Sequence, residues 1–200
     1  MPKNYWMFVQ TPENFEISKE RGLNLHGLRS RHRRRAQRMG PDDRVLFYVS
    51  GIRKWPATAS ITSRYFEDRT PIWKSYGKRV EEFPYRVRLT PAIVLDEEDY
   101  IDALVLGPGL EYVKRWAPER WYLAFQDTLH LLPQRDFRLI ESEMKKAPSG
   151  RRTGRGKMRS GEGGNSERAS GASEEVGPED EGADGDAPYP EAEDSASDSR

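Results

Sequence analysis

The sequence contains no cysteine. Disulfide bonds, thiolate nucleophiles and cysteine-ligated zinc are therefore all excluded. Because disulfides are rare in reducing compartments, a chain without cysteine fits such a compartment, and we expect a cytoplasmic protein.

Long hydrophobic runs are also missing. No apolar stretch approaches the roughly 20 residues that span a bilayer, and the opening MPKNYWMFVQ lacks the basic and then apolar layout of a signal peptide. We therefore expect neither a membrane segment nor a membrane partner.

Motifs typical of enzymes and cofactor sites are absent. The three histidines, His26, His32 and His130, show no H-E-x-x-H or H-x-E spacing, and the sequence has no P-loop, G-x-G-x-x-G or G-x-S-x-G. The stretch LDEEDYID (Leu95–Asp102) groups five acidic residues. Such a group can hold a divalent cation, but at the start of a helical turn it is more typical of solvated charge. The sequence thus predicts no catalysis, no metal and no cofactor.

Charge is balanced overall but unevenly distributed. Residues 147–200 contain 7 basic and 13 acidic side chains, so residues 1–146 carry a net charge of +6. The last part begins with a basic stretch, Arg151–Arg159, and is almost uniformly acidic from Glu174. Because it has too few apolar side chains to offset the entropy of ordering, we predict one domain at 1–146 and a disordered tail at 147–200. One interpretation is a tail that only solubilises the protein. In the other, the basic stretch binds nucleic acid loosely and the acidic stretch competes with nucleic acid for a basic surface.

Short runs rich in aromatic and β-branched residues alternate with amphipathic segments along the predicted domain. Helix start and stop signals predict helices at Thr11–Gly22, Arg31–Met39 and Pro133–Met144. This order is typical of an α+β fold, and we predict a small mixed β-barrel braced by flanking helices. The predicted strands are Tyr5–Gln10, Arg44–Ser50, Ala57–Phe66, Tyr85–Pro91 and Trp121–Gln126.

Arginine is concentrated in HGLRSRHRRRAQRM, which holds six arginines within fourteen residues. On a helix, four of these arginines share one face, and a second row of side chains on another face packs against the barrel. Residues 22–40 contain no Asp or Glu, which favours an anionic partner such as nucleic-acid phosphate over ion pairs within the protein, although that alternative stays open. The predicted phosphate-binding residues are Arg31, Arg34, Arg35 and Arg38, and the inward stripe is Leu28, His32, Ala36 and Met39.

Aromatic residues are numerous, with five tryptophans and nine tyrosines. We expect Trp6, Trp116 and Trp121 to lie in the core. Trp55 and Trp73 fall in polar, loop-like stretches, where packing alone explains a tryptophan poorly and stacking on a base explains it better.

Six stretches in the same order resemble the EVE-domain family of PUA-like folds. They are NYWMFVQTPENFEI, HGLRSRHRRRAQRMGPDDRVLFYVSG, YFEDRTPIW, FPYRVRL, ERWYLAF and LPQRDFRLIESEM, and together they cover residues 4–144. The resemblance implies a PUA-like barrel related to the YTH domain, and a module that binds a modified base of DNA or RNA between aromatic walls.

The resemblance also implies pocket residues. Asn14 matches the asparagine that contacts the base edge, and the other interpretation of Asn14 is an amide that caps the helix. His26 lies near one aromatic wall, where a tryptophan is more usual, and Trp73 lies at the second wall. Tyr48 is a further candidate for the pocket.

These observations predict a non-enzymatic reader of a modified base, in particular a methylated one. The alternative is a general RNA-binding accessory protein of translation or RNA modification, without selectivity for modified bases. A third hypothesis, an enzyme, would need His26 as its acid or base.

Overall fold

The computed structural model describes residues 3–75 and 82–150. The predicted basic and acidic stretches after residue 150 lie outside these described residues.

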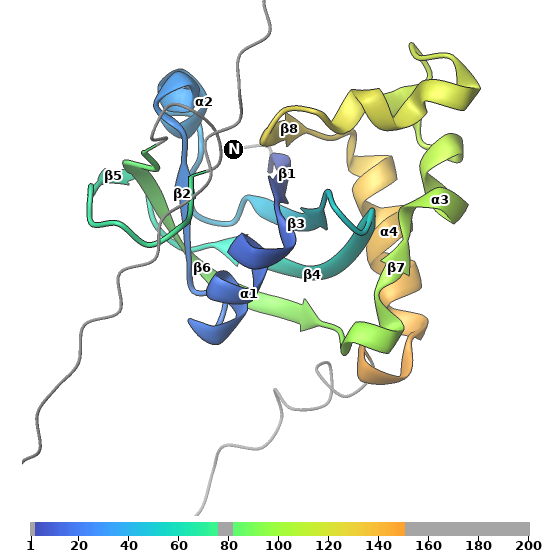
Figure 1. Cartoon of the computed structure of the whole chain (residues 1–200), viewed down its shortest axis with the longest axis horizontal. Helices are drawn as coiled ribbons and strands as arrows, with labels where there is room; N and C mark the ends of the chain where they lie inside the picture. Colours follow the sequence, from blue (N-terminus) through green and yellow to red (C-terminus); the bar gives the residue numbers. More distant parts are fainter. Residues whose placement is uncertain (1–2, 76–81, 151–200) are drawn as a thin grey trace, which may run out of the picture. The chain divides into compact units, whose positions relative to one another are not determined.

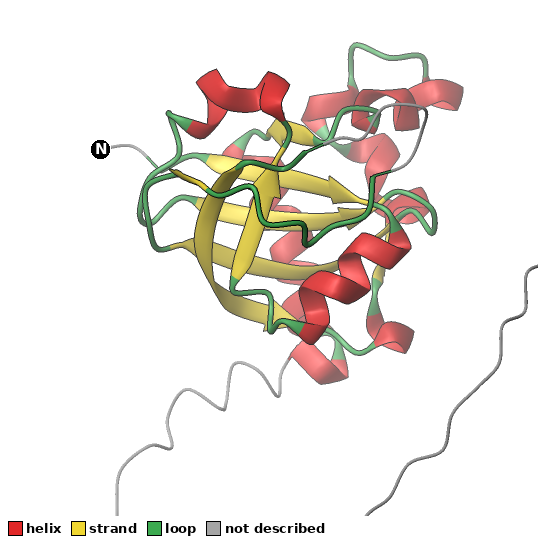
Figure 2. Ribbon diagram, turned by 60° about the vertical axis from the view of Figure 1, so that its left-hand side comes forward, coloured by secondary structure: helices red, strands yellow, loops and turns green. Residues whose placement is uncertain are grey.

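An eight-stranded mixed sheet forms the centre of the domain and curls into a partial barrel (Figure 2). Six strands follow one another in the order β2-β6-β4-β3-β1-β8, while β5 pairs with β6 and β7 pairs with β4. The fold class predicted from the sequence, an α+β barrel with flanking helices, is confirmed. The strands are β1 (Tyr5–Gln10), β2 (Leu25–Leu28), β3 (Arg44–Val49), β4 (Lys54–Ile61), β5 (Phe66–Glu67), β6 (Tyr85–Val94), β7 (Ile101–Asp102) and β8 (Leu129–Leu131).

Helices flank the sheet (Figure 1). The α-helices are α1 (Pro12–Glu20), α2 (Arg33–Ala36), α3 (Ala103–Leu106) and α4 (Gln134–Lys146). The 3-10 helices are η1 (Ser30–His32), η2 (Glu97–Asp99), η3 (Gly107–Gly109), η4 (Glu111–Val113) and η5 (Pro118–Phe125).

The neighbouring inner strands β1 and β3 run parallel and in register, with Phe8 beside Phe47 and Val9 beside Tyr48. Five consecutive residues of each strand are buried, because both faces of the sheet are covered here. Phe8 and Phe47 face the inside of the barrel, where Phe15 of α1 contacts Phe47 at 6.0 Å between ring centroids.

On the other face, α4 packs its apolar stripe against the sheet. Phe137, Ile140 and Met144 are all buried, and the Phe137 ring lies 5.0 Å from that of Tyr5. The predicted C-terminal helix is therefore confirmed, with bounds shifted by one or two residues.

The domain continues beyond its predicted end at residue 146. The Ser149 hydroxyl accepts a hydrogen bond from the Asp96 N–H at 3.1 Å, and the Ser149 N–H donates to the Asp99 carboxylate at 2.9 Å. Ser149 is buried, so residues 147–150 belong to the folded part rather than to the tail.

Some predicted elements were wrong. Residues 121–126 are not a strand but the end of η5 and its C-terminal cap, Gln126, and Trp121, Ala124 and Phe125 are buried at helical spacing. Their aromatic composition suggested a strand, whereas their periodicity is helical. The strand predicted at 57–66 is divided into β4, which begins earlier, and the short β5.

Two tryptophans also differ from expectation. Trp55 was predicted to lie in a loop but is a fully buried residue of β4. Trp116 was predicted to lie in the core but is 42% exposed. Trp6 and Trp121 are buried as expected.

The predicted helix at 31–39 is shorter than expected. It consists of η1 and the single turn of α2, and η1 has no side-chain cap and no acidic residue in its first turn. Without these stabilising features, consecutive arginines support only a brief helix. The inward stripe is nevertheless correct, because Leu28, His32, Ala36 and Met39 are all buried.

Asp43 joins the start of β1 to the turn before β3. Its buried carboxylate accepts hydrogen bonds from the Asn4 N–H and the Trp6 indole N–H, both at 2.9 Å, and from the Gly40 N–H at 3.3 Å. We predict that Asp43→Ala lowers the free energy of unfolding by about 3 kcal/mol, because it leaves buried donors without an acceptor. Chemical denaturation measures this change. The exposed Glu98→Ala serves as the control, and equal stability of the two variants would contradict the prediction.

Candidate functional site

A pocket of about 330 Å³ lies where β1 and β3 end. Because the two strands are parallel and in register, their carboxyl ends meet at one edge of the sheet, and Gln10 and Ser50 line the pocket there. The sequence-predicted pocket residues are all brought together in its lining, namely Asn14, His26, Tyr48 and Trp73.

The lining of the pocket is aromatic and cationic. Three cationic side chains line it, and no acidic residue does so among the residues that the structure describes. Its volume is at the lower end of the roughly 300–1,000 Å³ that small-molecule pockets occupy. The rings in the lining are His26, Tyr48, Trp73, Phe83, Tyr122 and Phe125, and the cations are Arg29, Arg53 and Lys74.

The Trp73 indole is held in place by a hydrogen bond and by close packing. Its Nε1–H donates to the Ser18 hydroxyl at 2.9 Å. A Cβ added to Gly27 of β2 would lie only 2.4 Å from the indole, so the ring rests against the backbone of that strand. The Arg86 guanidinium lies over the Trp73 ring, with its central carbon 5.6 Å from the ring centroid.

Ser18 was missed by the sequence analysis, although it connects several pocket residues. Its hydroxyl accepts from Trp73 and from the Gln10 side-chain amide, and donates to the Asn14 carbonyl, each at 2.9 Å. A serine inside a helix carries no sequence signal for such a role, because the partner that matters most for the pocket, Trp73, lies 55 positions away in the chain.

Asn14 uses its side-chain amide to hold the residue that follows Trp73. Its Oδ1 accepts from the Lys74 N–H at 2.8 Å, and its Nδ2 donates to the Lys74 carbonyl at 2.9 Å. The helix cap is Thr11, whose hydroxyl accepts from the Asn14 N–H, so the interpretation of Asn14 as a capping amide was wrong. A primary amide has two N–H donors and two lone pairs, so contacts with Lys74 use one of each.

His26 is a buried side of the pocket rather than an open wall. It stacks on Phe8 with ring centroids 4.0 Å apart and planes 11° apart, and it is 5% exposed. Burial lowers the pKa of His26 to about 3, so the imidazole is neutral at pH 7.

A base cannot be sandwiched between His26 and Trp73. Their ring centroids are 5.8 Å apart and the planes are tilted by 57°, so the rings contact each other. A sandwich requires two contacts of about 3.5 Å each, or about 7 Å in all. The expectation of a slot with these two rings as opposite walls is therefore corrected, because they form adjoining sides of the pocket.

Tyr48 and Tyr122 differ in how much of the ring is accessible. Tyr48 is 3% exposed and packs on Phe125 at 5.1 Å between centroids, and burial raises its pKa to about 12. Tyr122 is 36% exposed, and the Arg53 guanidinium lies 4.8 Å from its ring centroid. Sequence reasoning missed Tyr122, because the segment was assigned to a strand.

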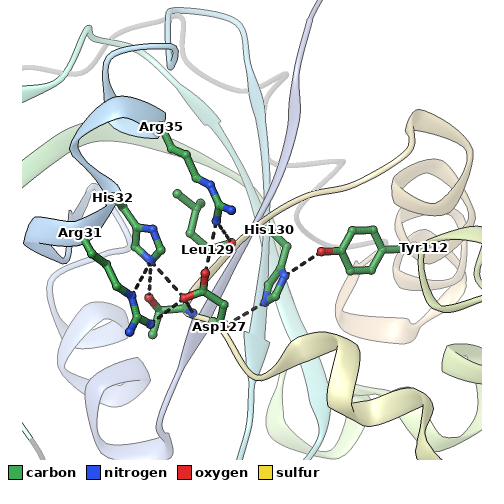
Figure 3. A network of polar contacts seen from close by, with 8 residues as sticks. Arg31, His32, Arg35, Tyr112, Asp127, Leu129 and His130 are labelled. Carbon is green, nitrogen blue, oxygen red and sulfur yellow. Dashed lines mark hydrogen bonds and ion pairs between the residues drawn. The ribbon is translucent and has the colours of Figure 1, made fainter. Parts of the chain in front are cut away.

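The predicted phosphate-binding arginines divide into two pairs. Arg31 and Arg35 both bind the Asp127 carboxylate, at 2.6 and 3.3 Å, and Arg35 also donates to the Leu129 carbonyl (Figure 3). Arg34 and Arg38 are exposed and have no ion pair with any residue that the structure describes. The alternative of internal ion pairs thus holds for the first pair and not for the second.

Asp127 connects this arginine pair to a wider network of polar contacts (Figure 3). The His32 Nε2 lies 3.2 Å from its carboxylate, and the His130 Nε2 lies 2.8 Å from its carbonyl oxygen. The other ring nitrogen of His130 is 2.9 Å from the Tyr112 hydroxyl. Burial raises the pKa of Asp127, but the Thr128 N–H and the neighbouring cationic groups lower it by more.

Among residues 3–75 and 82–150, no group of three or more His, Asp or Glu side chains is placed to hold a metal ion. In the same ranges, no helix has the length and apolar composition of a membrane span.

We predict that Gly27→Ala displaces the Trp73 indole, because the new methyl group would overlap the ring. Such overpacking typically lowers the free energy of unfolding by about 1–3 kcal/mol. Tryptophan fluorescence and denaturation detect the change. Gly109→Ala is the control, since a Cβ there meets nothing within 4 Å, and equal behaviour of both variants would show that the ring does not rest on Gly27.

We also predict that His26 makes stability fall with decreasing pH. Between about pH 6.5 and pH 3 the unfolded chain binds a proton at His26 that the folded chain excludes, so acidification favours unfolding. From pH 7 to pH 5 this amounts to about 2 kcal/mol. His26→Phe keeps an aromatic ring on Phe8 and should remove that part of the pH dependence, measured by denaturation at both pH values. An unchanged pH dependence would refute the assignment.

Comparisons with known proteins identify the family. The EVE domain matches residues 4–112. The chain is 28% identical over 147 residues to a UPF0310 protein of Pyrococcus horikoshii, covering 68% of this chain and 96% of that protein. A UPF0310 protein of Pyrococcus abyssi is also 28% identical over 147 residues, covering 70% and 98%.

Solved structures show the same fold at low identity. The YTH domain of Zygosaccharomyces rouxii MRB1, in complex with N6-methyladenosine RNA, is 16% identical with a TM-score of 0.53, covering 74% of this chain and 90% of that one. The YTH domain-containing protein mmi1, in complex with RNA, is 9% identical with a TM-score of 0.52, covering 72% and 85%. The match over more than half of its length shows that this chain belongs to the EVE domain family.

Proposed function

We propose that this domain binds nucleic acid by taking one unpaired, modified base into the pocket at the ends of β1 and β3. Exposed arginines hold the phosphates on either side of that base. The domain acts as a binding module and not as an enzyme.

The composition of the pocket lining carries this proposal. A base is a flat heterocycle attached to a negatively charged backbone, and the pocket combines aromatic rings with cations and has no acid in its described lining. Rings favour the flat faces of the base, and cations favour the phosphates. The volume of about 330 Å³ suits one small ligand rather than a peptide or a duplex.

The fold relatives support the same ligand class. One of the YTH domains with this fold was solved with RNA that contains N6-methyladenosine, and another was solved with RNA. A methyl group adds only about 0.8 kcal/mol by burial, so selective binding requires a close aromatic enclosure and polar contacts.

Trp73 and Tyr122 are the best candidates for the rings that enclose the base. The Trp73 indole is fixed by Ser18 and by Gly27, which lowers the entropy cost of stacking. Among the described rings of the lining, Tyr122 is the most exposed, so it can turn toward a ligand. Asn14 retains one donor and one acceptor beyond its contacts with Lys74, which suits the edge of a base.

His26 is better suited to packing than to catalysis. With a pKa of about 3 it is a weak base at pH 7, whereas an efficient general base has a pKa near the working pH. Its neutral ring closes the bottom of the pocket against Phe8.

Phosphate contacts are assigned to Arg34 and Arg38, since Arg31 and Arg35 already bind Asp127. Arg53 and Lys74 lie at the pocket itself and are placed to contact the phosphate of the bound nucleotide. None of these contacts distinguishes one base from another.

The test is a fluorescence-anisotropy titration of the full chain with single-stranded DNA and RNA 12-mers that contain N6-methyladenine, 5-methylcytosine or no modification. Trp73→Ala and Tyr122→Ala should each reduce the preference for one modified oligonucleotide, because a lost stacking contact costs about 1–3 kcal/mol. Arg34→Ala with Arg38→Ala should keep the preference but reduce the salt slope by about 1.4.

Because Tyr122 is exposed, its variant separates binding from folding, and thermal unfolding of both variants is the control. Equal affinity of the wild type for all oligonucleotides, with a steep salt slope, would refute the reader. That result would favour the alternative, a general RNA-binding accessory protein, for which folded RNA should bind better than single strands.

A further inference from the structure

A second hollow, of about 1190 Å³, lies on the other side of the segment that joins η5 to β8. It contains an exposed tryptophan and four cationic side chains. We call it the Trp116 groove and define it by Arg35, Arg38, Lys114, Arg115 and Trp116, which all line it.

Trp116 is an exposed tryptophan in the lining of this groove. It is 42% exposed and lies within seven consecutive exposed residues, 114–120. Packing therefore does not explain the tryptophan. An indole beside cations is the arrangement by which proteins stack unpaired bases and hold their phosphates.

The wall that carries Trp116 is anchored to the domain. The buried Asp136 carboxylate accepts from the Glu111 N–H at 3.0 Å and from the Tyr112 N–H at 2.7 Å. The main-chain N–H of Trp116 donates to the Val113 carbonyl at 2.8 Å. The main chain that carries the indole is consequently held in place, which lowers the cost of ordering this wall when a ligand binds.

The charge of the groove favours a polyanion. Its acidic lining residues are Glu111 and Asp127, and the Asp127 carboxylate is already bound by Arg31 and Arg35. Arg38, Lys114 and Arg115 are exposed and are left to attract phosphates.

The groove adjoins the pocket. Gln126 lines both, while Asp127 lines the groove and Thr128 lines the pocket, so three consecutive residues form the ridge between them. A strand that places one base in the pocket reaches the groove by crossing this ridge. Lys114, Arg115 and Trp116 lie beyond the stretch 4–112 that the EVE domain matches, so the family match does not itself account for this wall.

We propose that the Trp116 groove is a second subsite for single-stranded nucleic acid. It stacks an unpaired nucleotide that flanks the base in the pocket, and this proposal rests on the proposed function for the placement of that base. The groove sets the length of strand that the protein prefers, whereas the pocket sets the base.

The experiment compares the full-length wild type with Trp116→Ala and with Lys114→Ala/Arg115→Ala. Anisotropy is measured with a 12-mer and with a 3-mer that both carry the preferred modified base at the centre. We expect each variant to lose about tenfold in affinity for the 12-mer and less than twofold for the 3-mer, because only the longer strand reaches the groove. The double variant should also reduce the salt slope for the 12-mer by about 1.4.

The matched control is Lys145→Ala/Lys146→Ala on α4, which removes the same charge from exposed positions outside the groove. If the groove variants bind the 12-mer with the same affinity as the wild type and this control, the proposal is wrong. A synthetic peptide of residues 174–200 serves as an acidic polypeptide probe. If the groove variants weaken binding of that peptide and not of the 12-mer, the groove binds acidic protein and the proposal is equally overturned.

The two proposals fail in distinguishable ways. If the wild type does not discriminate modified from unmodified oligonucleotides, the proposed modified-base reader is wrong. The groove is then tested with unmodified strands, and a preference for the 12-mer that is lost in Trp116→Ala still supports it. If discrimination persists and Trp116→Ala has no effect on the 12-mer, the groove fails and the reader stands.

Discussion

The parallel, in-register pairing of β1 with β3 is the constraint on which the candidate site depends. It brings two carboxyl strand ends to one edge of the sheet, so Gln10 and Ser50, forty residues apart in the chain, line the same pocket. Helix α1 begins directly after β1 and thereby places Asn14 and Ser18 beside that edge. Any shift of register by one residue would turn Phe8 and Phe47 away from the barrel and dissolve this arrangement.

The pocket is built in advance of any ligand. A buried hydrogen bond holds the Trp73 indole on Ser18, and two partly buried ones hold the Lys74 backbone on Asn14. Such groups are costly to leave unsatisfied, so they fix one geometry of the loop. The absence of a side chain at Gly27 serves the same end, because it lets the indole approach the strand.

The arginine-rich segment shows how charge of one sign is divided between structure and solvent. Asp127, more than ninety residues away, binds both Arg31 and Arg35, and Arg35 also donates to the Leu129 carbonyl of β8. Arg34 and Arg38 remain exposed, and Arg38 lines the Trp116 groove. The same carboxylate therefore supports the segment and marks the ridge between the two hollows.

Local patterns in the sequence determined much of this protein. Short β-branched and aromatic runs gave β1 and β3, the Thr11–Pro12 start gave α1, and the helical spacing of Leu28, His32, Ala36 and Met39 gave the inward stripe. The resemblance to the EVE domain brought Asn14, His26, Tyr48 and Trp73 together as candidates. Only the tertiary structure decided that His26 is covered by Phe8, that Asn14 holds Lys74, that Asp127 binds two of the arginines, and that Trp116 faces solvent. The reason is physical: periodicity and capping act between residues a few positions apart, whereas burial and ion pairing depend on which distant segments the sheet places side by side.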